Sequence, residues 1–268
     1  MSANSSDKRK SLKESGDKAT RRSRILRSHW WLAVLIPGWV LIGFGLAREF
    51  LFAVIQTFAY LGVPFDAMNK TVLNFMLAAC IYILSVVIVI GVPWWVKKYK
   101  TSREELGLTR LPSWMDILLA PAAGVFYIIC SIALLAFVKA YVPEIDLDQV
   151  QETGFSNLNS QYELILAFIT LIIIAPVFEE VLFRGYLYGK LRKAVPIWLA
   201  ILIVSVVFAV VHGQWNVALD VFVLSIVLCI LREMTGNIWA GILLHMCKNG
   251  LAFYFLFVNP VLLRTMGG

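Results

Sequence analysis

Charged residues are scarce in this chain of 268 residues. Asp, Glu, Lys and Arg make up only 15% of it, whereas hydrophobic residues make up 60% and the mean hydropathy is +0.78. A soluble globular domain carries roughly 25% charged residues. The composition therefore excludes an ordinary soluble domain and predicts a polytopic membrane protein.

Cysteine is also scarce, and familiar metal-binding patterns are missing. The four cysteines stand in apolar segments, without metal-ligand spacing or a pairing pattern: Cys80, Cys130, Cys229 and Cys247. This argues against a disulfide framework or a zinc cluster, and we expect small buried hydrophobic side chains instead. The chain also lacks the HExxH pattern of zinc metalloproteases.

The N-terminal tail, residues 1–28, carries nine Lys or Arg against three acidic residues, and so holds most of the net charge of +7. It has no interleaved aromatic residues, which argues against a nucleic-acid partner. The apolar stretch that follows is long and lacks a small-residue cleavage site, so a cleavable signal peptide is not expected. We predict a disordered topogenic tail that keeps the N-terminus in the cytoplasm and contacts anionic lipid.

Several apolar segments approach the roughly 20 residues that a helix needs to cross a bilayer. The candidates are 31–47, 72–96, 116–140, 164–193, 195–212, 217–231 and 237–258. The apolar stretch 50–63 is either a separate crossing, an interfacial helix or the end of a tilted first helix. The sequence thus predicts an all-α transmembrane bundle of about seven to eight helices around a polar cavity.

The charges of the connections predict the orientation. Residues 97–110 carry five basic and two acidic residues, whereas 143–163 carry five acidic residues and no Lys or Arg. The first connection should be cytoplasmic and the second outside. An even number of crossings before residue 97 then favours a non-spanning 50–63 and seven crossings. The expected organisation is a tail (1–28), N-terminal membrane helices (29–115), a C-terminal membrane core (116–258) and a C-terminal tail (259–268).

The first polar cluster is "EEVLFR", which places Glu179, Glu180 and Arg184 inside an apolar span. A charge at membrane depth costs at least about 2.5 kcal/mol, so such residues usually mark a function. Residues four apart share a helix face, which pairs Glu180 with Arg184, whereas adjacent residues point about 100° apart. The two carboxylates should therefore not face one reactive point, and Glu179 is left without a local partner. An ion pair plus a spare carboxylate that merely stabilises the bundle explains the cluster equally well.

Two further clusters lie in later spans: "FAVVH", from Phe208 to His212, and "HMCKN", from His245 to Asn249. Each alone is explained by hydrogen bonds between membrane helices. A rise of 1.5 Å per residue puts Glu179 about 21 Å and His212 about 25 Å above the basic helix end, but His245 only about 12 Å. Tilt or a broken helix would have to close that gap to unite the four groups.

Taken together, "EEVLFR", "FAVVH" and "HMCKN" fit the EExxxR, FxxxH and HxxxN motifs in order and spacing. With all three intact, the region 116–258 resembles the CPBP intramembrane proteases, the type II CAAX prenyl protease and bacteriocin-processing family, also called Abi-type. The first 110 residues carry no motif of that family.

The resemblance implies roles for these residues. Glu179 would be the general base that activates a water molecule, and His212 would hold the same water. His245 and Asn249 would stabilise the oxyanion of the tetrahedral intermediate. The residues expected to support the site are Glu180, Arg184 and Phe208.

A metal remains an alternative for the same side chains. Glu179, His212 and His245 are a plausible ligand set for a divalent ion such as zinc, but Glu179 would then be a ligand rather than a base. The resemblance to a glutamate-dependent, metal-independent mechanism favours no metal and no other cofactor. Activity should then survive strong chelation.

The leading hypothesis is an intramembrane endopeptidase of a bacterial cell membrane that cleaves a membrane-associated protein or peptide near the bilayer surface. A non-catalytic scaffold or bacteriocin-immunity protein of the same fold is the alternative. A transporter with a proton relay ranks last, because no inverted repeat or pair of broken helices is recognisable.

Overall fold

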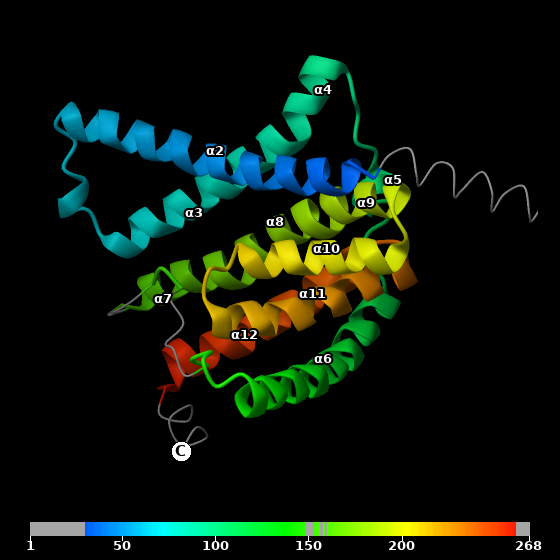
Figure 1. The fold of residues 1–268 in the computed structure, drawn as a ribbon. Helices are drawn as coiled ribbons and strands as arrows, with labels where there is room; N and C mark the ends of the chain where they lie inside the picture. The colour runs from blue at the N-terminus through cyan, green and yellow to red at the C-terminus, as the bar shows by residue number, and fades with distance from the viewer. Residues whose placement is uncertain (1–29, 148–152, 156–157, 159, 261–268) are drawn as a thin grey trace, which may run out of the picture.

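The computed structural model describes residues 30–147, 153–155, 158 and 160–260, and every regular element within them is a helix (Figure 1). This confirms the predicted all-α fold. The tail 1–28 and residues 261–268 lie outside the described residues. In chain order the elements are α2 (Leu32–Tyr60), η1 (Phe65–Ala67), α3 (Lys70–Val86), η2 (Val87–Gly91), α4 (Val92–Lys97), α5 (Arg103–Leu106), α6 (Trp114–Tyr141), α7 (Gln161–Phe168), η3 (Ile169–Ile174), α8 (Ala175–Glu179), η4 (Glu180–Leu187), α9 (Tyr188–Ala194), α10 (Ile197–Val210), α11 (Trp215–Thr235), α12 (Trp239–Phe253) and η5 (Tyr254–Val258).

Five helical stretches of the described chain are long and apolar enough to cross a membrane. They are Leu32–Tyr60, Lys70–Lys97, Trp114–Tyr141, Gln161–Ala194 and Trp239–Val258. The helix α10 is apolar but has only 14 residues, and α11 carries charged side chains. Residues 50–60 continue α2, so the stretch 50–63 is the end of the first helix rather than a separate crossing. The molecule is a helical polytopic membrane bundle.

Polar residues next to the apolar stretches set where the helices begin. The serines before α5, α6 and α7 each form a capping box with the acidic residue three positions later: Ser102, Ser113 and Ser160. The side chain of Asn69 accepts hydrogen bonds from two backbone N–H groups at the start of α3. Each cap satisfies N–H groups that have no partner inside the helix.

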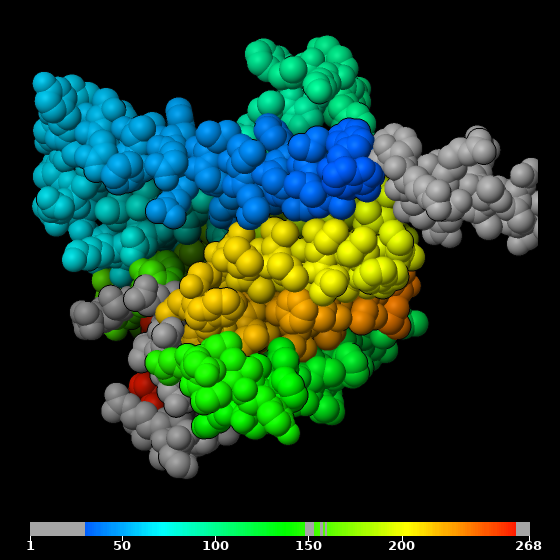
Figure 2. Space-filling model, viewed as in Figure 1, coloured from blue at the N-terminus to red at the C-terminus, as the bar shows by residue number. Residues whose placement is uncertain are grey.

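The helices form two connected parts (Figure 1). The helices α2 and α3 lie side by side as a hairpin, and α6, α10, α11 and α12 pack together below it. The continuous helix from α7 to α9 contacts both α3 and α12, so it lies between the two parts. The short helix α4 stands out from the body of the molecule above α2 (Figure 2).

Prolines explain where two of these long helices widen. Pro93 follows the π segment η2 and Pro176 follows the π segment η3. Proline has no N–H group and its ring crowds the carbonyl group four residues earlier, and a wider turn relieves both problems. A third π segment, η4, begins directly after Glu179. The "EEVLFR" motif therefore starts where the helix changes its pitch.

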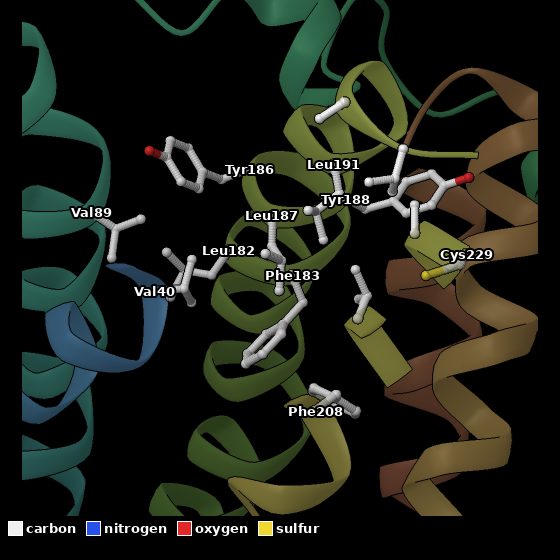
Figure 3. Close-up of a cluster of buried hydrophobic side chains, with 14 of the residues drawn as sticks. Val40, Val89, Leu182, Phe183, Tyr186, Leu187, Tyr188, Leu191, Phe208 and Cys229 are labelled. Atoms are coloured by element: carbon white, nitrogen blue, oxygen red, sulfur yellow. The ribbon is translucent and has the colours of Figure 1, made fainter. Parts of the chain in front are cut away.

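Apolar side chains of five helical stretches hold this region together (Figure 3). Val40 of α2 and Val89 of η2 lie beside Leu182 of η4, and all three are fully buried. Phe183 meets Phe208 of α10 edge to face, with 4.9 Å between the ring centroids. Of the cysteines, Cys229 is buried in this cluster as expected. Cys80 and Cys247 instead lie exposed on helix surfaces, so the expectation that all four are buried was wrong.

Two glycines let the connection with α5 lie directly on the helix that carries Glu179. A Cβ atom at Gly189 would stand 2.2 Å from the carbonyl oxygen of Glu105, and one at Gly185 would stand 3.1 Å from that of Leu106. Only glycine permits the first of these contacts. The Glu105 carboxylate is thereby brought to Lys190 and Lys193, at 2.9 and 2.8 Å.

Candidate active site

Glu179 is held by a residue from the N-terminal part of the chain. The hydroxyl group of Tyr82 on α3 donates a hydrogen bond of 2.6 Å to Oε1 of Glu179. The Tyr82 ring stacks on Phe178 and meets Phe44 edge to face, both at 5.9 Å between centroids, which fixes its position. Glu179 has no partner within its own helix, as expected, but α3 supplies one. Sequence reasoning missed Tyr82, although a phenol within an apolar span was the available signal.

His245 lies between the two adjacent carboxylates. Its Nδ1 atom is 3.0 Å from Oε1 of Glu180, and its Nε2 atom is 3.7 Å from Oε2 of Glu179. An ionised carboxylate only accepts, so Nδ1 carries the proton and donates to Glu180. The two carboxylates approach different nitrogens of the ring, which agrees with the expectation that adjacent residues point in different directions. A single imidazole presents nitrogens on two sides, so it reaches both carboxylates although they point in different directions.

Because their side chains approach to 3.7 Å, Glu179 and His245 lie at a similar depth, whereas a uniform α-helical rise predicts different depths for them. The segment between Glu179 and the basic helix end contains the eight-residue π segment η4. A π turn takes more residues than an α turn, so the helix advances less per residue there. Glu179 consequently lies closer to the level of His245 than regular α-helical geometry places it.

The predicted ion pair between Glu180 and Arg184 is present and buried. Nη1 of Arg184 is 3.0 Å from Oε1 of Glu180, and both residues have an exposed fraction of 0%. The helix α12 approaches closely because residue 241 is glycine: a Cβ atom there would stand 3.1 Å from Oε2 of Glu180. The Glu180 carboxylate thus pairs with both the guanidinium group of Arg184 and the imidazole of His245.

Phe208 connects the charged residues with His212. The Arg184 guanidinium carbon lies 4.3 Å from the centroid of the Phe208 ring, which is cation–π geometry. The imidazoles of His212 and His245 meet the same ring at 4.8 and 5.9 Å. Nδ1 of His212 is 2.7 Å from the carbonyl oxygen of Phe208 and must donate to it. In neutral His212 the lone pair therefore resides on Nε2.

Asn249 makes its hydrogen bond away from the other candidate residues. Its Nδ2 atom donates to the carbonyl oxygen of Leu171, at 2.9 Å. In a ladder of i→i+5 bonds this carbonyl group would accept from residue 176, which is proline and has no N–H group. The Asn249 amide thus supplies the donor that Pro176 lacks and ties α12 to η3. Its role at an oxyanion stays a prediction.

A second polar network lies beside the first, and sequence reasoning missed it. Nζ of Lys248 is 3.2 Å from Oδ2 of Asp220, and Asp220 also accepts hydrogen bonds from Tyr127 and Ser131. The network joins α6, α11 and α12. The signal available in the sequence was the pair of opposite charges, Asp220 and Lys248, within apolar segments, because charges at membrane depth usually pair.

The side chains were tested as a possible metal site. Among the described residues, no three His, Cys, Asp or Glu side chains are arranged to hold an ion. His245 directs Nδ1 to Glu180, and His212 directs Nδ1 to a carbonyl oxygen. Both of these bonds use Nδ1 and leave Nε2 as the other ring nitrogen, so they do not themselves exclude a ligand role, and metal independence stays a prediction.

Comparison with known proteins links these motifs to proteases. The family model for type II CAAX prenyl endopeptidase, Rce1-like, matches residues 161–251. The membrane-embedded CAAX protease MroQ of Staphylococcus aureus (strain USA300) is 28% identical over 98 residues, which are 34% of this chain and 40% of that protein. An uncharacterized 24.3 kDa protein of Escherichia coli is 32% identical over 98 residues, 35% of this chain and 45% of that protein.

The match is confined to one part of each protein. The aligned segments span less than half of these two relatives. No solved structure matches the chain significantly. The matched segment 161–251 nevertheless contains all three motifs. Over these residues the chain is similar to the Rce1-like family of type II CAAX prenyl endopeptidases, which confirms the resemblance that the motifs indicated.

Proposed function

We propose that this chain is an intramembrane endopeptidase of a bacterial cell membrane, with its N-terminus in the cytoplasm. It hydrolyses a peptide bond of a membrane-associated protein or peptide near the bilayer surface. The observation that carries this proposal is the pair formed by Oε2 of Glu179 and Nε2 of His245, at 3.7 Å. This separation is too long for a direct hydrogen bond, and both residues are fixed by their other polar atoms. A carboxylate oxygen and an imidazole nitrogen thus stand side by side without a direct hydrogen bond between them.

In this mechanism Glu179 and His212 orient the attacking water. One proton of the water points to Oε2 of Glu179 and the other to Nε2 of His212, so an oxygen lone pair is directed at the substrate carbonyl carbon. Glu179 takes the proton as the C–O bond forms and later gives it to the leaving amine as the C–N bond breaks. General base catalysis of this kind contributes about 10²- to 10⁴-fold in rate.

His245 stabilises the oxyanion, with Asn249 as a second donor. His245 donates through Nδ1 to Glu180, so it can donate through Nε2 to an oxyanion only when both nitrogens carry protons. In this form the Glu180 carboxylate accepts the Nδ1 proton of His245. With Arg184 also paired to Glu180, the two positive groups balance the two carboxylates, so the buried site stays neutral overall.

The test uses the purified chain in liposomes, mixed with bacterial membrane proteins in H₂¹⁸O. If the chain is an endopeptidase, mass spectrometry will find new C-terminal carboxyl groups that carry one ¹⁸O atom. Liposomes prepared in the same way from cells that lack the chain are the control. If labelled C-termini are equally frequent in both samples, the chain does not hydrolyse these proteins, and the scaffold alternative is favoured.

Strong chelation is expected to leave the activity unchanged. The assigned roles use Glu179 as a base, and the described side chains do not form a ligand set. The measurement compares peptide cleavage before and after incubation with EDTA and with 1,10-phenanthroline. Loss of cleavage that zinc restores would instead make Glu179 a ligand.

A further inference from the structure

A cavity with a basic rim opens at the end of the bundle where α2 begins and α4 and α9 end. It has a volume of about 570 Å³. Its lining combines apolar residues with Lys97, Lys190 and Lys193, two tyrosines and Glu105. None of these side chains belongs to the proposed catalytic machinery.

This basic cavity continues into an apolar groove between α2 and α4. The groove has a volume of about 540 Å³ and is lined mainly by aliphatic and aromatic residues, including Val34, Ile42 and Val96. The two spaces share lining residues, among them Pro93 and Lys97. Together they form one amphipathic channel, which we name the α2–α4 channel, with an apolar body and a charged mouth.

The charges at the mouth do not cancel. Partial burial raises the pKa of Glu105, but hydrogen bonds from Lys193 and Lys190 outweigh this effect and lower the pKa to about 2. The ionised carboxylate therefore offsets one of the three lysines and leaves the mouth with a charge of +2. Lys190 is fixed over the rings of Tyr99 and Tyr186, at 4.2 and 5.3 Å. Lys97 and Lys193 are both exposed, and Lys193 reaches the mouth while it is also paired with Glu105.

Tryptophans place this mouth at the surface of the bilayer. Trp30 and Trp31 precede α2, and Trp94 and Trp95 lie on α4 beside the groove. All four are exposed, with Trp95 at 77%. Tryptophan is enriched at membrane–water interfaces. The charged mouth is thus at the level of lipid headgroups, while the apolar groove extends toward the hydrocarbon.

We propose that the α2–α4 channel binds an anionic phospholipid, with its phosphate between Lys97 and Lys193 and one acyl chain in the groove. The charge of the mouth, the apolar lining of the groove and the level of the tryptophans together fit this occupant. A zwitterionic lipid of the same chain length lacks the net charge that the lysines complement. Bound there, the lipid joins α2 to α4 and contacts Tyr186 of η4.

The headgroup is tested by native mass spectrometry of the purified full chain, titrated with dioleoylphosphatidylglycerol and dioleoylphosphatidylcholine. Because a lysine near a membrane surface contributes about 1 kcal/mol toward an anionic lipid, K97Q with K193Q should weaken phosphatidylglycerol binding roughly thirtyfold. Binding of phosphatidylcholine should stay unchanged. The matched control is K98Q with K100Q, which removes the same charge from the neighbouring connection. Equal weakening by both pairs would mean diffuse attraction and would overturn the proposal.

The acyl chain is tested by filling the groove. Gly38 lines it, and a Cβ atom there meets no atom within 4 Å, so Gly38→Phe occupies the space of the chain without a clash in the protein. Gly45 lies on the same helix, has the same open surroundings and does not line the groove. Gly38→Phe should weaken phosphatidylglycerol binding at least tenfold, whereas Gly45→Phe should not. Unchanged binding in Gly38→Phe would overturn the placement of the chain.

Discussion

Glu179→Gln is expected to lower kcat for peptide hydrolysis by about 10²- to 10⁴-fold, because it removes the base that activates the water. The amide oxygen of glutamine still accepts the hydrogen bond of Tyr82, so the side chain keeps its position. Substrate binding does not depend on this proton transfer, and KM should stay nearly constant. The measurement is the rate of ¹⁸O-labelled product formation at saturating and at low substrate concentration.

Tyr82→Phe is the companion variant for this experiment. It removes the hydroxyl group that holds Oε1 of Glu179 but keeps the ring between Phe44 and Phe178. A hydrogen bond to a charged group contributes about 1.5–3 kcal/mol, so the loss in kcat should be about 10- to 150-fold, toward the lower end of the range for Glu179→Gln. If Glu179→Gln keeps more than about a tenth of the wild-type rate, general base catalysis by Glu179 is wrong.

The sequence predicted the helices and the ion pair well because both depend on local rules. Apolar length and capping serines define the spans, and a separation of four residues brings Arg184 to Glu180. Glu179 and His245 also come from the expected helices, whereas His212 lies in the turn that follows α10. The end of α2 was an open question because no turn residue separates residue 50 from the preceding span.

The rest of the site depends on tertiary geometry. The level of His245 relative to Glu179 follows from the π segment η4, and a uniform rise per residue cannot reveal such a segment. Tyr82 reaches Glu179 only because α3 packs against α8, which is a contact between residues 97 positions apart. The bond of Asn249 to Leu171 likewise depends on a widened turn in another helix.

Glu180→Gln is expected to destabilise the fold by about 3–5 kcal/mol, because it leaves the buried guanidinium group of Arg184 without a counter-charge. The carboxylate is fully buried, so water cannot replace it. Glutamine keeps the size of the side chain, which limits the change to charge. The measurement is reversible unfolding of the purified chain in mixed micelles by SDS. A loss below about 1 kcal/mol would show that solvent reaches the pair.

A double replacement separates the stability of the bundle from the function of His245. In Glu180→Leu with Arg184→Met, both buried charges are gone, and exchange of a whole ion pair for apolar residues is often neutral or stabilising by about 1–4 kcal/mol. The fold should therefore regain most of the stability that Glu180→Gln loses. Activity should stay low, because Nδ1 of His245 loses the carboxylate to which it donates, and the ring is no longer held in place. Recovery of both properties would mean that Glu180 only stabilises the fold, whereas recovery of stability alone makes it the residue that orients His245.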